Sequence, residues 1–228
     1  MIGCAAPSLP AAYRNARICG HCMRHTITSH RWTKAHREKT MGIAPQLLLP
    51  KKVEKGPWPL AVMRTERVLL RPWTREDVDS LHALWTAPEV RRYLWDDVVI
   101  TRDTAEKVVE SHLDSVKRHG IGYWALHILP AISLVGAPIA GFCGFRFIGN
   151  GPEIELMYGL RPEYWGRGLA TEACIAALEF LWRSTKLTQV HARTDPPNEK
   201  SLQVMLRLGM THMSTTESMI TYALRRPG

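Results

Sequence analysis

A glycine-containing turn stands between an expected strand and an expected helix, in the run Trp165-Gly166-Arg167-Gly168-Leu169-Ala170. Glycine lets a backbone turn tightly and approach a ligand closely. The free N–H groups at the start of a helix converge on one place, and the helix dipole adds partial positive charge there. We therefore expect this turn to bind a pyrophosphate group, with Arg167 adding a cation.

Two common phosphate-binding motifs do not describe this turn. A Walker loop ends in Gly-Lys-Ser/Thr, and this turn lacks that ending. A dinucleotide-binding turn is followed by an acidic residue about 20 residues further on, whereas Asp195 lies about 27 residues beyond Gly168. The surrounding sequence must therefore identify the ligand.

The residues around the turn resemble a known family. The run ELMYGLRPEYWGRGLATEA, residues 155–173, closely resembles the acetyl-CoA-binding core of the GNAT N-acetyltransferases, in their RimJ/RimL-like branch. Residues 198–201 and 206–210 resemble a second signature of that branch, and residues 65–77 resemble its opening strand and helix. The superfamily loop usually opens with Gln or Arg, and Trp165 stands in that place, as is common in this branch. The resemblance covers about Met63 to Leu224.

The resemblance implies an α/β fold with a mixed, mostly antiparallel central sheet, helices on both faces and a splayed pair of parallel strands. The parallel strands would be 153–160 and 188–194, with the pantetheine arm of acetyl-CoA between them. Asn198 and Ser201 match positions that line the cofactor, although helix capping alone would explain both. The other residues implied in acetyl-CoA binding are the backbone of Met157 and Tyr158, for the pantetheine and thioester, and Trp165, Gly166, Arg167, Gly168, Leu169, Ala170 and Thr171, for the pyrophosphate. No metal is implied.

The implied reaction is direct attack of a primary amine on acetyl-CoA in a ternary complex. An amine attacks only when neutral, and a free ammonium has a pKa of about 10, so a base or a dry site must deprotonate it. Glu155 shares a strand face with Met157 and matches the acidic position proposed as the base in this branch; a salt-bridged carboxylate is the alternative. Many relatives protonate the departing thiolate with a Tyr of the last helix. No Tyr lies between Asn198 and Gly209, so Ser201 is the nearest candidate.

Family analogy places the segment between the first two helices over the acceptor. Tyr93 and Trp95 lie there, and we expect them either to bind the acceptor or to anchor the packing. Asp96 and Asp97 would attract a cationic amine or remain solvated. Similarity of fold does not choose between a small-molecule amine and a peptide or protein amino terminus.

Periodicity and end signals predict the elements that position these groups. Thr74 to Asp77 looks like a capping box before a helix that Pro88 stops, and a second helix runs from Thr101 to Gly120. The remaining predicted elements are strands at 68–71, 123–128, 138–147, 153–160, 188–194, 211–215 and 219–224, a helix from Leu169, and a last helix from Asn198 to Gly209.

The first 62 residues differ in charge from the rest. Their ten Lys and Arg stand against Glu38 and Glu54 alone, so they carry +8 of the total charge of +9. They show no sustained period of 2 or 3.6. We therefore expect residues 1–62 to be a disordered basic leader or a mis-called start, before a GNAT-like domain over residues 63–228. The nearly neutral domain does not have the charge of a nucleic-acid-binding surface.

Composition limits the setting and leaves one rival function. No apolar run approaches the about 18 residues of a membrane span, and five cysteines indicate no disulfide framework. We therefore expect a cytoplasmic protein without a membrane partner, and leave a homodimer open. Cys19-Gly20-His21-Cys22 resembles the motif of disulfide isomerases but lacks the strand and helix that this chemistry needs. The rival function is a catalytically degenerate acyl-CoA-binding module whose basic leader contacts nucleic acid.

Overall fold

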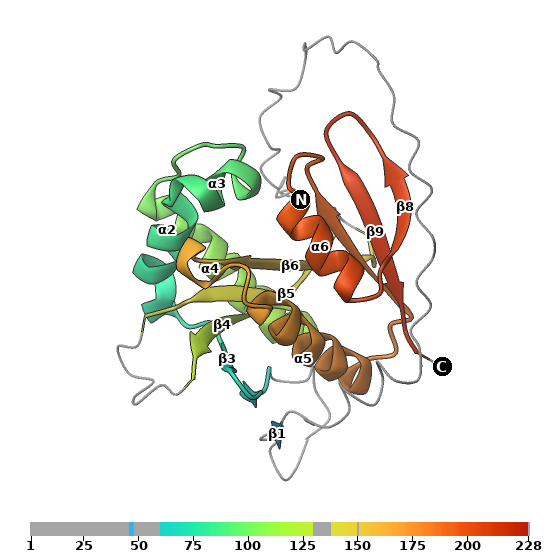
Figure 1. The fold of residues 1–228 in the computed structure, drawn as a ribbon. Coiled ribbons are helices and arrows are strands. Elements are labelled where there is room, and N and C mark those ends of the chain that lie inside the picture. The colour runs from blue at the N-terminus through green and yellow to red at the C-terminus, as the bar shows by residue number, and fades with distance from the viewer. Residues whose placement is uncertain (1–45, 48–59, 130–137, 150, 228) are drawn as a thin grey trace, which may run out of the picture.

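One nine-stranded sheet runs through the residues that the computed structural model describes, which are 46–47, 60–129, 138–149 and 151–227. The strand order is β1-β2-β3-β4-β5-β6-β7-β9-β8, and every neighbouring pair is antiparallel except β6 with β7. The strands are β1 Gln46–Leu47, β2 Met63–Arg64, β3 Val68–Pro72, β4 Tyr123–Ile128, β5 Gly141–Phe147, β6 Ile154–Leu160, β7 Gln189–Thr194, β8 Thr211–Thr215 and β9 Ile220–Arg225 (Figure 1).

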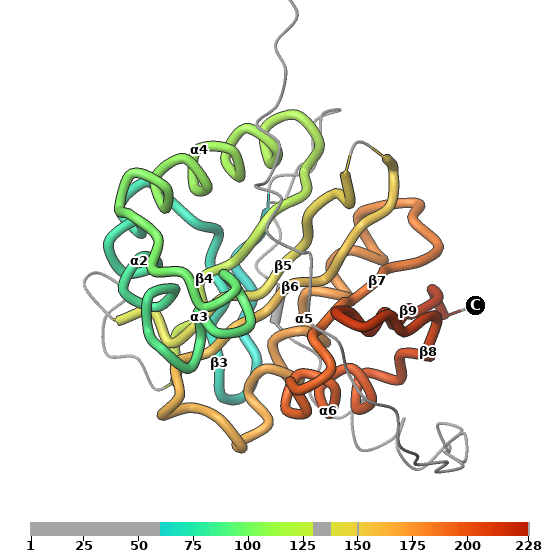
Figure 2. Tube along the Cα trace, turned by 90° about the horizontal axis from the view of Figure 1, so that it is seen from above, coloured from blue at the N-terminus to red at the C-terminus, as the bar shows by residue number. Residues whose placement is uncertain are grey.

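Helices cover both faces of this sheet (Figure 2). One face carries α2 Val78–Thr86, α3 Pro88–Leu94 and α4 Arg102–His119, and the other carries α5 Leu169–Ser184 and α6 Glu199–Arg207. Each face has its own buried cluster. Trp73, Leu81, Trp85 and Phe142 lie in the cluster under α2 to α4, and Leu156, Ala173, Phe180 and Val190 lie in the cluster under α5 and α6. Two short 3-10 turns, η1 Arg75–Asp77 and η2 Pro162–Tyr164, precede α2 and the glycine turn.

The predicted helix ends are present, with one correction. The capping box of Thr74 and Asp77 forms, and Thr101 caps α4 by accepting a hydrogen bond from the Thr104 N–H at 3.2 Å. The helix α2 ends before Pro88 as predicted, but the prediction that no helix lies between α2 and Thr101 was wrong, because α3 lies there. Pro88 is also the first residue of α3, because a proline at the first helical position has a suitable φ and needs no N–H acceptor.

The parallel pair explains how the sheet opens. The register between β6 and β7 in the described residues contains one pair, Glu155 with His191. The ladder stops there, so the strands diverge toward their carboxyl ends and the later residues of β6 have backbone groups without a ladder partner on that side. The predicted fold class is confirmed, including the splayed parallel pair.

Most of the predicted leader, residues 1–45 and 48–59 with the Cys19–Cys22 motif, lies outside the described residues. Leu60 and Ala61 are described, and both are buried in the core. The Trp124 indole N–H donates to the Ala61 carbonyl oxygen at 2.8 Å. The folded unit therefore reaches upstream of position 63, through Leu60 and Ala61 and through β1, which pairs with β2 although it lies within the predicted leader.

Candidate functional site: a glycine turn beside an opened sheet

The glycine turn leads directly into α5. Gly166 and Gly168 have φ values of 72° and 76°, in the left-handed region that favours glycine. Gly168 is the N-cap, and the first helical bond runs from the Glu172 N–H to the Gly168 carbonyl oxygen at 3.1 Å. The amides of residues 169–171 precede that bond, so the helix offers them no acceptor. Several N–H groups are therefore available at the positive end of the helix dipole.

Three contacts from separate elements hold the turn. The Trp165 indole N–H donates to the Leu160 carbonyl oxygen at 2.8 Å, which folds the turn back onto the carboxyl end of β6. The Lys200 ammonium of α6 lies 4.1 Å from the centroid of the Trp165 ring. Arg67 Nη1 donates to the Arg167 carbonyl oxygen at 2.9 Å. Contacts within the protein alone thus hold the turn in position.

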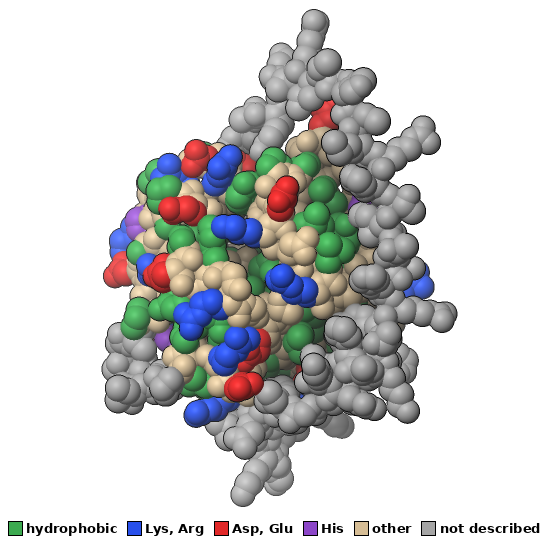
Figure 3. Space-filling model, in the orientation of Figure 1, with side chains coloured by type: hydrophobic (Ala, Val, Ile, Leu, Met, Phe, Trp, Pro, Cys, Tyr) green, Lys and Arg blue, Asp and Glu red, His purple; other side chains and the backbone are tan. Residues whose placement is uncertain are grey.

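The residues of the turn fit a pyrophosphate group. The Thr171 hydroxyl oxygen is buried and has no hydrogen-bond partner among the described residues. A Cβ on Gly166 would meet no atom within 4 Å, so the turn is open on that side. Leu169 points into the core, and Arg167 is exposed. On the side of the molecule drawn in Figure 3, Lys and Arg side chains are scattered among hydrophobic and other side chains, with some Asp and Glu side chains between them.

Tyr158, Asn198 and Ser201 come together on the α6 side of the opened sheet. The Tyr158 hydroxyl and Ser201 Oγ lie 2.9 Å apart, and the Tyr158 hydroxyl also donates to the Ser201 carbonyl oxygen at 2.9 Å. Asn198 Oδ1 accepts from the Ser201 N–H at 3.2 Å, so Asn198 does cap α6. Burial raises the pKa of the Tyr158 hydroxyl. The tyrosine hydroxyl beside Ser201 comes from Tyr158 of β6 and not from the last helix. The sequence pattern indicates only that Tyr158 lies on the strand face opposite to that of Glu155.

Glu155 is buried between two arginines. Its side chain is 2% exposed, Oε1 accepts from Arg193 Nε at 2.8 Å, and Oε2 accepts from Arg146 Nε at 2.7 Å and from Arg193 Nη2 at 3.0 Å. Burial alone would raise the pKa of the Glu155 carboxyl, but the hydrogen bonds and charges of the two arginines outweigh it and lower that pKa. Glu155 therefore joins β5, β6 and β7 at the point where the parallel pair begins to open.

Asp195 is a candidate that the sequence analysis considered only for ribose binding. It directly follows β7 on the opened side of the sheet, and it is two residues beyond Arg193. Burial raises the pKa of the Asp195 carboxyl, and the Asp96 carboxylate raises it further. The pKa of Asp195 is thus shifted in the direction opposite to that of Glu155. The sequence feature that could have indicated Asp195 is its position directly after the end of a predicted strand.

The segment predicted to cover the acceptor reaches this edge. The Tyr93 hydroxyl donates to the Pro197 carbonyl oxygen at 3.4 Å, which connects α3 to the loop after β7. The Trp95 ring lies 5.8 Å from the Trp85 ring, in a packing contact. Asp96 and Asp97 have φ values of 52° and 61°, an unusual conformation for residues other than glycine. The structure brings Tyr93 to the edge, and it gives Trp95 the contact expected of a packing anchor.

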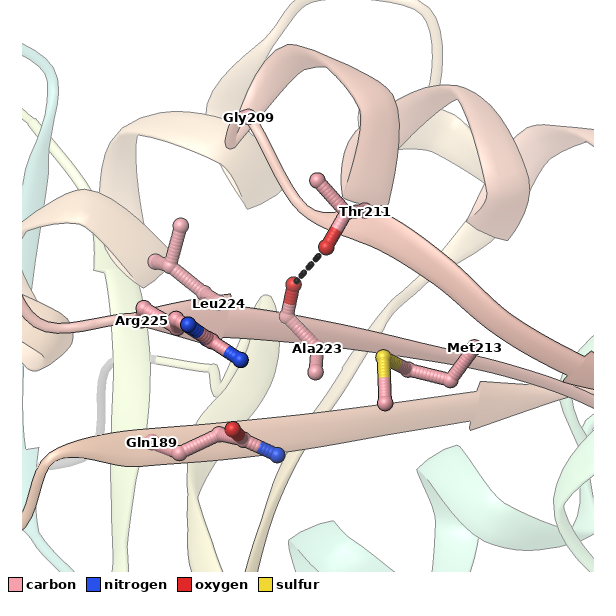
Figure 4. A pocket seen from close by; sticks show the side chains of 7 residues that line it. All are labelled: Gln189, Gly209, Thr211, Met213, Ala223, Leu224 and Arg225. Carbon is pink, nitrogen blue, oxygen red and sulfur yellow. Dashed lines mark hydrogen bonds between the residues drawn. The ribbon is translucent and has the colours of Figure 1, made fainter.

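A hollow of about 420 Å³ lies elsewhere, at the β7–β9–β8 edge. Figure 4 shows its lining side chains and the hydrogen bond from the Thr211 hydroxyl to the Ala223 carbonyl oxygen, at 3.3 Å. No residue predicted for the site lines it. The lining residues are Gln189, Gly209, Thr211, Met213, Ala223, Leu224 and Arg225.

Within the described ranges, no group of three or more His, Cys, Asp or Glu side chains is arranged to hold a metal ion. No helix there has the length and apolar character to cross a membrane.

Comparison with known proteins identifies the family. The acetyltransferase (GNAT) domain matches residues 67–211. The uncharacterized N-acetyltransferase p20 of Bacillus licheniformis is 27% identical over 152 residues, covering 64% of this chain and 80% of that protein. An acetyltransferase structure from Agrobacterium tumefaciens has a TM-score of 0.63 at 21% identity, covering 77% of this chain and 100% of that one. RimL, a ribosomal L7/L12 alpha-N-protein acetyltransferase in complex with coenzyme A, has a TM-score of 0.58 at 18% identity, covering 70% of this chain and 94% of that one. The chain belongs to the GNAT acetyltransferase family.

Proposed function

We propose that this chain is an N-acetyltransferase of the RimJ/RimL-like branch, which transfers an acetyl group from acetyl-CoA to a primary amine of a small molecule or of a peptide or protein amino terminus. One observation carries the proposal. The sheet opens after the Glu155–His191 pair, and the Trp165–Leu160 bond brings the glycine turn to the carboxyl end of the same strand. A pantetheine arm followed by a pyrophosphate needs these two features side by side. The shared fold with a RimL structure that contains coenzyme A supports the assignment.

The transfer is proposed to be direct, with no acyl-enzyme. Acetyl-CoA supplies an activated acyl group, and the chain orients it and the amine. Both cysteines of the described residues, Cys143 and Cys174, are free and buried in the core. Burial raises the pKa of the Cys174 thiol well above its ordinary value, which disfavours the nucleophilic thiolate. The backbone of Met157 and Tyr158 is proposed to hold the pantetheine and thioester.

Two carboxyl groups compete for the proton of the acceptor amine. Glu155 matches the family position, but its three bonds to guanidinium groups support the bridging role that the sequence left open. Asp195 stands at the end of β7, and burial raises the pKa of its carboxyl, which is the direction that suits a proton acceptor. The pH–rate profiles of Glu155→Gln and Asp195→Asn separate the two. Loss of about 10²–10⁴-fold in kcat identifies the base, and small losses in both assign deprotonation to a dry site.

Protonation of the departing thiolate is proposed to involve Ser201 and Tyr158. Their hydroxyls are hydrogen-bonded to one another, so a proton that one hydroxyl gives to the thiolate can be replaced by the proton of the other. Tyr158→Phe and Ser201→Ala test them individually. We expect kcat to fall in the variant that lacks the hydroxyl that protonates the thiolate, while the KM for acetyl-CoA changes less. Equal kcat in both variants and in the wild type would remove this pair from the mechanism.

The rival function, a degenerate acyl-CoA-binding module with a nucleic-acid-contacting leader, differs in turnover. Release of free thiol from acetyl-CoA is therefore the decisive assay, run with a panel of small amines and of peptides with free amino termini. Amine-dependent release supports the enzyme, and the preferred amine defines the acceptor class. Tight binding of acetyl-CoA without release over the whole panel would support the rival.

A further inference from the structure

A network outside the predicted site ties the turn between β2 and β3 to the first turn of α5. The Glu172 carboxylate accepts hydrogen bonds from the Thr65 hydroxyl at 2.6 Å, from the Arg67 backbone N–H at 2.9 Å and from Arg67 Nε at 2.7 Å. Arg67 Nη2 lies 2.6 Å from Glu172 Oε2, the same oxygen that accepts from Arg67 Nε, so the guanidinium group forms an ion pair with this carboxylate. Arg67 and Glu172 are 105 residues apart in sequence, so the network joins the start of the domain to the helix of the glycine turn.

The same arginine reaches the turn itself through the Arg167 carbonyl oxygen, which accepts from Arg67 Nη1 at 2.9 Å. A trans peptide group is planar, and its C=O and N–H point in opposite directions. The carbonyl of Arg167 and the N–H of Gly168 belong to one peptide group. Because Arg67 holds the carbonyl, it also fixes the direction of the Gly168 N–H, which points away from the guanidinium group.

Two details support this role for Arg67. A Cβ on Gly168 would lie 3.6 Å from Arg67 Nη2, so the guanidinium group packs directly beside the turn. Its bonds go to the Glu172 carboxylate and to the Arg167 carbonyl, which are fixed groups of the protein. The Glu172 side chain is only 18% exposed against 47% for Arg67, so the carboxylate is the anchored partner of the pair.

We propose that Arg67 is a positioning residue for acetyl-CoA. Glu172 holds the Arg67 guanidinium group, which orients the Arg167–Gly168 peptide group so that the Gly168 N–H can donate to the pyrophosphate of acetyl-CoA. The inference rests on the proposed function, because it requires acetyl-CoA in the glycine turn. Holding the amide in advance lowers the ordering cost of binding. Arg67 acts through the turn and not by touching the reacting atoms.

The test compares two acetyl donors that differ in the part that Arg67 serves. Acetyl-CoA contains the pyrophosphate, and the acetyl thioester of pantetheine lacks it. In Arg67→Ala we expect the KM and the Kd for acetyl-CoA to rise about tenfold or more, with kcat within about twofold. The kcat/KM for acetyl-pantetheine should stay within about twofold. Arg67→Lys keeps one donor for the carbonyl and should recover part of the affinity.

Arg75→Ala is the matched control, because it removes an arginine from an exposed ion pair with Glu110, remote from the turn. The kinetic constants of Arg75→Ala should equal those of the wild type with both acetyl donors. An equal loss with both donors in Arg67→Ala and Arg67→Lys, or no loss in either variant, would overturn the positioning role. A wild-type chain that binds neither acetyl-CoA nor acetyl-pantetheine would overturn the proposed function together with this inference. Normal wild-type binding with unaffected Arg67 variants overturns the inference alone.

Discussion

Glu155 and Glu172 are each held by arginines, and they lie on opposite faces of the sheet. Glu155 of β6 binds Arg146 and Arg193 of the two adjacent strands, on the face of α2 to α4. Glu172 of α5 binds Arg67, which lies far away in sequence, beside the glycine turn. Both carboxyls have lowered pKa values, and both join separate segments. The difference lies in what each pair fixes: Glu155 fixes the strands where the sheet opens, and Glu172 fixes the turn that faces the proposed co-substrate.

The role of an acidic residue in this chain depends on its partners more than on its strand or helix face. Glu155 drew attention because its face and family position suit a base. Glu172 lies in the first turn of α5, where an acidic residue suits the helix dipole. Only the fold shows that each carboxylate forms ion pairs with guanidinium groups. An ion-paired carboxylate has a lowered pKa, so it holds other groups in position more readily than it accepts a proton.

The largest expected effect is that of Glu155→Gln on stability. Loss of the buried charge leaves two arginines without their shared partner, so the free energy of unfolding should fall by about 3 kcal/mol. The affinity for acetyl-CoA should stay within about twofold, and turnover per folded molecule within about tenfold, because the turn is held separately. Denaturant unfolding and thiol release on one preparation measure these quantities. Unchanged stability with a turnover loss of about 10²–10⁴-fold would instead establish Glu155 as the base.

On the Glu172 side, Gly168→Val should weaken acetyl-CoA binding about 10–100-fold. The φ of 76° is costly for a β-branched residue, by about 1–3 kcal/mol, so the turn should rearrange. Calorimetric titration measures the affinity. Gly149→Val is the matched control, because Gly149 has a φ of 57° with nothing near its Cβ position. The control should lose stability and keep its affinity. Equal affinity losses in both variants would contradict a specific role for the turn at Gly168.

Acidification should distinguish the two pairs more subtly. Glu155 and Glu172 have pKa values below the ordinary 4.5 of Glu, so each contributes stability that is present above about pH 4.5 and lost as the pH falls through its folded-state pKa. The free energy of unfolding of the wild type should therefore fall on acidification below this pH. Below about pH 4.5, the free energy of unfolding should depend less on pH in Glu155→Gln than in the wild type. The difference should be smaller for Glu172→Gln, because Glu172 is more exposed. Unfolding curves at successive pH values measure this dependence, and an identical pH dependence in all three proteins would contradict the ion pairs.

The smallest expected effect is that of Asp195→Asn on stability. Its raised pKa means that folding favours the protonated form, so the ionised carboxylate costs stability at pH 7. Removing the charge should raise the free energy of unfolding at pH 7 by about 0.5 kcal/mol, and the gain should vanish at pH values where the carboxyl is protonated. Thermal unfolding at both pH values measures it. A loss of stability at pH 7 would show that the Asp195 carboxylate has a stabilising partner.

The sequence predicted the elements of the fold well because their signals are local. The strand at 123–128 and the N-cap at Thr101 are as predicted, since alternation and capping depend on neighbouring residues. The helix α3 was missed because Pro88 serves both as the end of one helix and as the start of the next.

The site was predictable only where its groups belong to one segment. The glycine turn and the Asn198 cap lie within short runs and could be predicted from spacing. The partners of Glu155, the Tyr158–Ser201 bond and the Arg67–Glu172 network join segments distant in sequence, and no local period indicates them. The acceptor side also depends on contacts between distant segments, such as Tyr93 with Pro197, so the sequence left two alternative roles open for each of its residues.

Binding of acetyl-CoA in the glycine turn is tested most directly by titrating the isotopically labelled chain with acetyl-CoA and following its backbone amide signals. We predict saturable changes at the amides of residues 166–171, which acetyl-pantetheine should largely fail to produce. Changes confined to the hollow of the β7–β9–β8 edge, near Thr211 and Ala223, or no saturable changes in the turn, would contradict it.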